Sequence, residues 1–163
     1  TESLALTAAG NARSVVERGV TTVRDLGSAN GLAVHVRDAV AEDRIVGPRV
    51  RACGRAITMT GGHGHWFGRE ADGAAEIRTA VREQLKLGAD VVKCMATGGV
   101  LTAGADTGAV ELTREELEVL VDTAAAKGVP TAAHAHGTAG IVNASEGGIT
   151  CVEHGTYMDR EAA

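Results

Sequence analysis

The sequence predicts an α/β fold in which parallel strands alternate with helices, and three observations support this prediction. Short β-branched runs are separated by stretches with helical spacing. Glycine follows four of these helical stretches, and only 2 of the 163 residues are proline. Strands are expected to start near residues 20, 49, 90, 129 and 149. Regular alternation of this kind requires right-handed crossovers and therefore a parallel sheet.

In the N-terminal half, apolar residues with helical spacing alternate with short β-branched runs. Gly19 and Gly88 each follow a helical stretch and are suited to a left-handed stop. Gly54 lies inside a strand-like run and marks a bend or a close backbone approach. The expected elements, in order, are a helix at 3–18, a strand at 20–26, a helix at 31–43, a strand at 48–57 and a helix at 73–87.

The C-terminal half continues the alternation. Thr113 and Glu116 stand three apart before an apolar run, which is the signature of a capping box at the start of a helix. That helix is expected to stop at Gly128, and the short helix that follows the next strand stops at Gly147. The expected elements are a strand from about 90, a helix from 113, a strand ending at 134, a helix at 138–146 and a strand at 149–153.

Length and composition limit the class of protein. The chain is long enough for one domain, residues 1–163, and its hydrophobic content of 44% indicates a globular protein. No apolar run approaches the roughly 20 residues of a membrane helix, and a net charge of −5 without a basic cluster argues against nucleic acid as a partner. The 3 cysteines form no CxxC pair, so we expect reduced thiols in a cytoplasmic protein.

Two closures of the parallel sheet are consistent with the alternation. A doubly wound open sheet suits five strands, whereas a (β/α)₈ barrel needs about 250 residues and eight strands. Ligands bind at the carboxyl ends of the strands in both architectures. Length alone favours the open sheet.

A lysine lies inside one of the apolar strands. On a two-residue period, Lys93 shares a face with Val91 and Met95, and the other face holds Val92 and Cys94. Lysine is seldom fully buried without a partner, and desolvation lowers its pKa. Lys93 either reaches solvent or a carboxylate from the strand end, or has a function that requires a buried amine.

Histidines follow the predicted strands. Five of the six histidines lie just after a strand, and only His35 lies in a helix. Neutral imidazole is the commonest metal ligand and suits zinc. A single histidine on an apolar strand is usually a packed core residue, but five at one end of a parallel sheet favour a site. The five are His63, His65, His134, His136 and His154.

The motifs around these residues resemble those of the metal-dependent amidohydrolase superfamily, in its imidazolonepropionase-like and Xaa-Pro dipeptidase-like branch. The matching segments are Val-Lys93-Cys-Met-Ala-Thr-Gly-Gly, Ala-His134-Ala-His136-Gly, Val-Glu-His154-Gly, Thr-Gly-Gly-His63-Gly and Gly-Val-Thr-Thr-Val-Arg-Asp25-Leu-Gly. This resemblance implies a partial TIM (β/α)₈ barrel that contains strands 2 to 6 and lacks strand 1 and strands 7 and 8. It is the reason for preferring the barrel over the open sheet.

The resemblance also implies the roles of individual residues. Lys93 would be carboxylated and bridge two divalent metals, with zinc the expected ion. His134 and His154 would bind the second metal, and His136 would act in catalysis and contact the substrate. Arg55 is a weaker candidate for substrate contact. The residues expected near the substrate are His63, His65, His136 and Tyr157.

The implied function is metal-dependent hydrolysis of a C–N bond in a small amide or dipeptide by metal-activated water. The chain has no strand for the His-x-His pair of strand 1 and stops before the metal-binding aspartate of the last strand; Asp25 and Asp106 lie in the wrong places for that role. We therefore expect the 163-residue chain alone to be inactive and to self-associate as a homo-oligomer. Two alternatives remain, a non-catalytic half-barrel and an open-sheet module whose Thr60–Gly62 and Thr97–Gly99 loops bind an anion.

Overall fold

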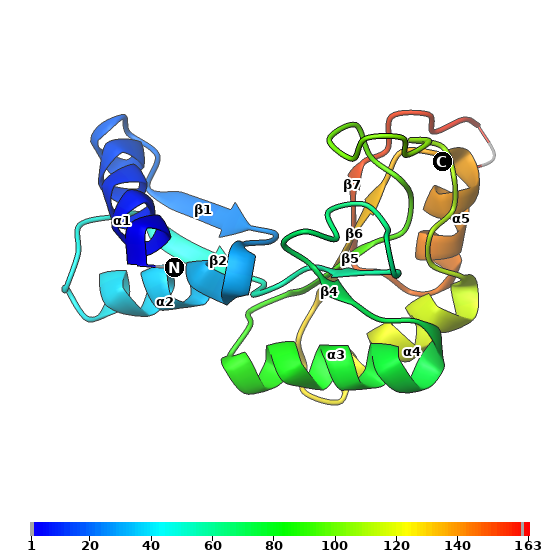
Figure 1. Ribbon diagram of the computed structural model, residues 1–163, viewed down its shortest axis with the longest axis horizontal. Helices are drawn as coiled ribbons and strands as arrows, with labels where there is room; N and C mark the ends of the chain where they lie inside the picture. Colours follow the sequence, from blue (N-terminus) through cyan, green and yellow to red (C-terminus); the bar gives the residue numbers. More distant parts are fainter. Residues whose placement is uncertain (1, 161) are drawn as a thin grey trace.

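The computed structural model describes residues 2–160 and 162–163, and it confirms the predicted alternation of helices and strands (Figure 1). The helices are α1 (Glu2–Glu17), the 3₁₀ turn η1 (Ala29–Gly31), α2 (Leu32–Ala41), α3 (Gly73–Leu87), α4 (Arg114–Ala125) and α5 (Thr138–Glu146). The strands are β1 (Thr22–Asp25), β2 (Arg49–Ala52), β3 (Ile57–Thr58), β4 (Arg69–Glu70), β5 (Val92–Met95), β6 (Thr131–Ala135) and β7 (Cys151–His154).

Every pair of neighbouring strands is parallel, but the strands form two sheets rather than one. One sheet has the order β1-β2 and the other the order β4-β3-β5-β6-β7. The expected strand at 48–57 is therefore wrong as a single element, because the backbone turns at Gly54, where φ is +76°. A Cβ atom at Gly54 would lie 2.7 Å from Gln84 Oε1, so this turn packs against α3 and requires glycine.

A backbone hydrogen bond bridges the gap between the two sheets. The Asp90 N–H, just before β5, donates to the Ala52 carbonyl of β2 at 2.8 Å, whereas the bond from the Cys53 N–H to the Asp25 carbonyl, at 3.1 Å, extends the β1–β2 pair. The strands thus follow one another in the order expected for strands 2 to 6 of a barrel, with the third strand interrupted. The additional strand β4 was not predicted, because two residues are too few to show a two-residue pattern.

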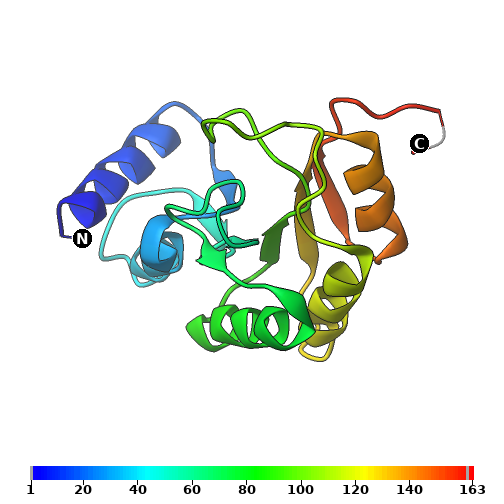
Figure 2. The same cartoon turned by 45° about the vertical axis from the view of Figure 1, so that its right-hand side comes forward.

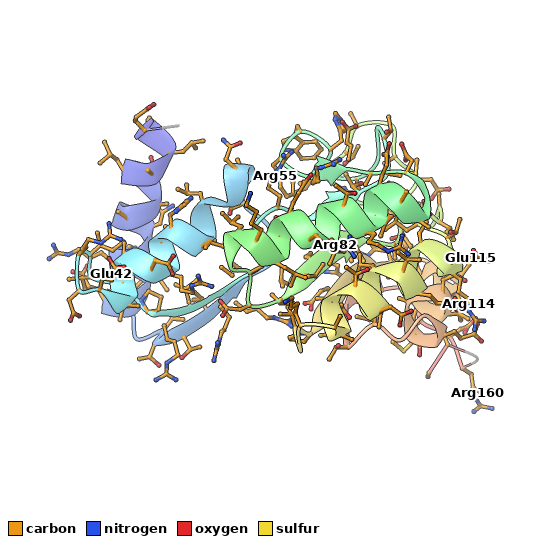
Figure 3. All side chains as sticks on the ribbon, turned by 90° about the horizontal axis from the view of Figure 1, so that it is seen from below. Glu42, Arg55, Arg82, Arg114, Glu115 and Arg160 are labelled. Atoms are coloured by element: carbon orange, nitrogen blue, oxygen red, sulfur yellow. The ribbon has the colours of Figure 1, made fainter. Side chains whose placement is uncertain are left out.

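The outer face of the larger sheet is covered by helices. Val92 and Cys94 are fully buried there in a core that also contains Ile77 of α3 and Leu117 of α4. Helices α3, α4 and α5 lie along this face (Figure 2). Seen from below, α3 and α4 run side by side, with Arg82 on α3 and the labelled pair Arg114 and Glu115 at the start of α4 (Figure 3).

The ends of α4 show how the sequence defines a helix. Thr113 accepts a hydrogen bond from the Glu116 N–H, and Glu116 accepts one from the Thr113 N–H, so the predicted capping box is present. Arg114 Nη1 lies 2.6 Å from Glu146 Oε2, which joins the start of α4 to the end of α5. Because the capping box fixes the start of α4 at Arg114, it also fixes the end of the loop that leads from β5 to α4.

The inner face carries a second, smaller core. Cys53, Val91 and Ala132 are buried together there, with Leu26 and Cys151 packed against them. Lys93 lies opposite Ala132 in the β5–β6 ladder, and side chains at matching positions of parallel strands share a face. The inner face therefore presents Lys93 directly above an apolar layer, as the two-residue period predicted.

The loops that leave the carboxyl ends of the strands gather at one end of the larger sheet. The segment after β5 contacts the segment after β3 through Thr102 and His63, and the segment after β7 through Thr107 and Tyr157. In parallel α/β folds this end of the sheet carries the functional groups. Within the described residues, no helix has both the length and the apolar character needed to cross a membrane.

Candidate metal centre

Lys93 is a buried amine that forms no ion pair with an acidic side chain among the described residues. Its side chain is 4% exposed, and Nζ donates to the Cys94 carbonyl at 2.9 Å and approaches Met95 Sδ at 3.4 Å. Burial lowers the pKa of Lys93 from 10.5 to about 8, because the charged form loses its hydration. Lys93 therefore neither reaches solvent nor forms an ion pair, and near neutral pH part of its population is a neutral amine.

His134 lies on β6, two residues beyond the position opposite Lys93. Its side chain is 6% exposed, and Nε2 lies 3.1 Å from the Gly98 carbonyl oxygen. A carbonyl can only accept a hydrogen bond, so Nε2 carries the proton and Nδ1 keeps its lone pair. In metal-binding histidines, the ring nitrogen that does not bind the metal commonly donates a hydrogen bond of this kind, which orients the ring and fixes its tautomer.

His154 is the last residue of β7, and its backbone is unusual. It lies opposite Ala135 in the β6–β7 ladder, so simple alternation would send its side chain to the other face from that of His134. Its φ of +74° is in the left-handed region, which non-glycine residues rarely adopt. This turn brings the His154 ring to 4.7 Å from the His134 ring, measured between centroids. Strained backbone of this kind occurs at functional sites.

His136 completes a cluster of three imidazoles. Its ring centroid lies 4.6 Å from that of His134 and 4.8 Å from that of His154. One ligand atom from each of the three histidines can be chosen so that all lie within 4.8 Å of one another. Lys93, His134, His136 and His154 were expected to converge at one end of a parallel sheet, and this geometry confirms the convergence of the three histidines.

His63 joins the cluster from the loop after β3. Its ring is 7% exposed and tilted against the His134 ring, with centroids 4.4 Å apart. Nδ1 of His63 lies 2.7 Å from Thr102 Oγ1, and its backbone N–H donates to both carboxylate oxygens of Glu111, at 2.8 and 2.9 Å. The loop that follows Lys93 thus holds the residue expected near the substrate.

The other expected substrate contacts lie at the edge of the site. The Tyr157 ring is 6.3 Å from the His136 ring, and its hydroxyl is 3.1 Å from Thr107 Oγ1. His65 is exposed and packs edge-on against Trp66 at 5.5 Å. The Arg55 guanidinium hydrogen-bonds the Phe67 and Gly68 carbonyls, which occupies it within its own loop.

Burial favours the neutral form of three of the imidazoles, those of His63, His134 and His136. Burial, with the nearby Lys93 charge as the next cause, lowers the pKa of His134 to about 3 and also lowers the pKa of His63. Burial and the neighbouring His154 lower the pKa of His136. A metal ligand must be unprotonated, so these shifts prepare the cluster for a cation.

The donor set fits a divalent metal. Neutral imidazoles suit zinc, copper, nickel and iron, and a catalytic zinc has about three protein ligands with one open position. His134 and His154 would serve as ligands as expected, and His136 is close enough to be a third, although its Nδ1 already lies 2.7 Å from Thr156 Oγ1. Asp25 and Asp106 are held by local turns, through Gly27 N–H and Gly108 N–H, and neither belongs to the cluster.

The anion-binding alternative finds little support in the Thr60–Gly62 loop. The Thr60 N–H donates to Asp72 and the Gly61 N–H to Glu70, at 3.0 and 2.8 Å. The Gly62 N–H donates to the Met59 carbonyl at 2.9 Å. Two protein carboxylates therefore occupy N–H groups that a phosphate would need, and their negative charge would repel it.

These features define a class of protein. The parallel α/β sheet carries a buried lysine and histidines at its strand ends, which is the arrangement expected for an amidohydrolase. The amidohydrolase family profile matches residues 1–163, so the chain belongs to the amidohydrolase family. Ochratoxinase of Aspergillus niger is 34% identical over 171 residues, which cover 90% of this chain and 35% of that protein.

Solved structures give the same result. A Xaa-Pro dipeptidase with bound methionine in its active site superposes with a TM-score of 0.92 at 35% identity, over 97% of this chain and 42% of that one. The Aspergillus niger ochratoxinase structure superposes with a TM-score of 0.89 at 33% identity, with the same coverage. The partial-barrel fold and the dipeptidase-like branch are thereby confirmed. The chain spans about a third of the curated relative and less than half of these structures.

Some residues of the site were not predicted from the sequence. Thr102 and Glu111 lie in a loop without a regular pattern, and the Gly98 carbonyl that orients His134 belongs to the backbone. The glycines at 98 and 99 were noted only as part of a motif. Glu111 lies two residues before Thr113 of the capping box, and this position in the sequence does not indicate a contact with His63.

Proposed function

We propose that this chain provides the central strands of a metal-dependent hydrolase that cleaves the C–N bond of a small amide or dipeptide. The observation that carries this proposal is the convergence of His134, His136 and His154 at one strand end, on a sheet that also buries Lys93. Membership of the amidohydrolase family supports hydrolysis of an amide. The name of one relative, a Xaa-Pro dipeptidase, supports a dipeptide as the substrate.

Lys93 is suited to the role of a carboxylated, metal-bridging residue. Only a neutral amine reacts with carbon dioxide, and with a pKa of about 8 roughly a quarter of Lys93 is neutral at pH 7.5. A lysine with the ordinary pKa of 10.5 would be neutral in about 0.1% of molecules at that pH. The apolar layer below Lys93 therefore raises the reactive fraction by about two orders of magnitude.

The histidines divide the remaining tasks. His134 and His154 would hold a divalent ion, for which we propose zinc, and a second ion would need ligands that this chain does not supply. A bound divalent metal supplies a water of lowered pKa and polarises the scissile carbonyl. His136 and His63 would orient the substrate, with Tyr157 at the edge of the site and His65 further out.

Measurements of activity and metal content in variants of Lys93 and His136 test this assignment. In the protein that carries all the barrel strands, Lys93→Ala should lose metal and activity, and propionate should restore part of both by replacing the carbamate. His136→Ala should keep its metal and lose turnover or substrate affinity. The matched control is His35→Ala, an exposed histidine on α2 far from the cluster in sequence. A panel of dipeptides and N-acyl amino acids, with metal measured alongside, gives the readout.

Two results would contradict the proposal. One is a Lys93→Ala protein with normal metal content and rate. The other is full turnover by the 163-residue chain alone, because we propose that this chain lacks half of the metal ligands and the proton acceptor. We further propose that the protein is cytoplasmic and that the chain associates with copies of itself.

A further inference from the structure

The loop between β5 and α4 encloses His63 and forms hydrogen bonds with both its backbone and its ring. Glu111 accepts the His63 N–H with both carboxylate oxygens, and Thr102 Oγ1 lies 2.7 Å from His63 Nδ1. Thr102 Oγ1 also accepts the Gly64 N–H at 3.2 Å. One residue of this loop therefore fixes the backbone of His63 and another fixes its ring.

The loop itself is anchored to the strand that carries Lys93. The Glu111 N–H donates to the Ala96 carbonyl at 2.9 Å, and the Gly98 N–H donates to the Ala109 carbonyl at 3.0 Å. Thr97 and Val110 form an antiparallel bridge between these two bonds. Glu111 is consequently held at a fixed distance from the end of β5.

Two glycines allow the close approach. A Cβ atom at Gly99 would lie 2.4 Å from atoms of the His63 ring, and one at Gly62 would lie 2.7 Å from Glu111 Oε2. Real Cβ atoms do not approach other atoms this closely, so a side chain at either position would displace His63 or Glu111. The packing of His63 thus depends on the absence of side chains on both sides.

The hydrogen bonds also select a tautomer. The hydroxyl oxygen of Thr102 accepts from the Gly64 N–H, and its own proton faces His63 Nδ1 at 2.7 Å. If Thr102 donates to Nδ1, the neutral ring carries its proton on Nε2. The ring lies against His134, with centroids 4.4 Å apart, so His63 borders the metal centre.

We propose that Thr102 and Glu111 are positioning residues that hold His63 as a fixed Nε2–H donor, which binds an oxygen atom of the substrate. This inference rests on the proposed function, because it assigns His63 to the same site. Thr102 sets which nitrogen carries the proton, and Glu111 sets where the ring stands. Neither residue contacts the reacting atoms.

The first test reads the tautomer directly and needs no activity. In the chain labelled with ¹⁵N-histidine, the His63 ring signals, assigned by their loss in His63→Ala, should show the Nε2–H form. Thr102→Val, which keeps the shape of the side chain and removes the hydroxyl, should move the ring toward a mixture of tautomers. A His63 ring in the Nδ1–H form, or a Thr102→Val spectrum identical to the wild type, would overturn the inference whether or not the protein hydrolyses amides.

The second test is kinetic and uses the protein that carries all the barrel strands. Thr102→Val and Glu111→Ala should each lower kcat/KM about 5- to 10-fold, the loss expected from one misplaced hydrogen bond. Glu111→Gln keeps one acceptor oxygen and should recover part of the rate. The matched controls Thr123→Val and Glu118→Gln, both on α4, should stay within twofold of the wild type.

A double-mutant comparison separates positioning from a general loss of structure. In a His63→Ala background, Thr102→Val and Glu111→Ala should have no further effect on kcat/KM beyond twofold, because the residue through which they act is absent. Effects that add in full to that of His63→Ala would show that both residues act elsewhere and would refute the inference. Metal content should be the same in all of these variants.

Discussion

The charge of Lys93 should destabilise the folded protein, and replacing it with methionine should reveal by how much. The side chain is 4% exposed and already contacts Met95, so Lys93→Met fills the same space without a charge. Burial lowers the pKa of Lys93 from 10.5 to about 8. A tenfold change in an equilibrium constant is about 1.4 kcal/mol, so holding the protonated amine in this site costs the folded state about 3 kcal/mol.

The sign of the effect defines its pH window. The unfolded chain binds the proton below pH 10.5 and the folded chain only below about 8, so stability rises with pH between these values. Below pH 8 the penalty is fully present, and above 10.5 it is absent. Lys93→Met should therefore be about 3 kcal/mol more stable than the wild type at pH 7 and equal to it near pH 10.5.

Urea unfolding of the metal-free protein, followed by circular dichroism from pH 7 to 10.5, measures this difference. Buffers free of carbon dioxide prevent carbamate formation, and a single protein concentration keeps any self-association constant. Burial raises the pKa of Cys53 and Cys94 to about 12, which affects both proteins in the same direction and largely cancels in the comparison. A stability difference that does not change with pH would refute the argument that Lys93 is desolvated.

Three further predictions follow from the same structure. Dialysed chain should hold clearly less than two equivalents of divalent metal by elemental analysis, and His134→Ala should hold less still; two tightly bound ions would show that no ligand is missing. Sedimentation should detect self-association, because the outermost strands leave N–H and C=O groups that can pair with another chain, whereas a well-folded monomer would contradict this. Thr113→Ala should lower the free energy of unfolding by about 1 kcal/mol through loss of the α4 cap, and an unchanged value would mean that the cap contributes nothing.

The sequence was sufficient where a local pattern is decided by local physics. The helical period, the glycine stops and the capping box at Thr113 predicted both ends of α3 and the start of α4, although α4 ends at Ala125 and not at Gly128. The two-residue period assigned Lys93 to the face opposite Val92 and Cys94, and the structure confirms this assignment. Parallel crossovers place all strand exits at one end, so the position of His134, His136 and His154 at the same end of the sheet also followed from order along the chain.

Two features of the sheet were predicted in part or not at all. Gly54 was expected to mark a bend or a close backbone approach, but the length of the interruption depends on Gln84 and Leu87 of α3, which approach the position where a Cβ would stand. The pairing of β4 with β3 involves Arg69 and Glu70, whose side chains carry no strand signal. Both are set by contacts between segments distant along the chain, which a pattern within one segment does not encode.

The chemistry of the site divides in the same way. The sequence alone determined which residue types could bind a metal and on which strands they lie, because strand register and alternation are local properties. Only the tertiary structure decided their protonation and orientation. The Gly98 carbonyl fixes the tautomer of His134, the positive φ of His154 turns its ring toward the cluster, and burial lowers the pKa of Lys93. Tautomer, ring direction and desolvation depend on atoms brought together across the sheet, and these neighbours exist only once the chain has folded.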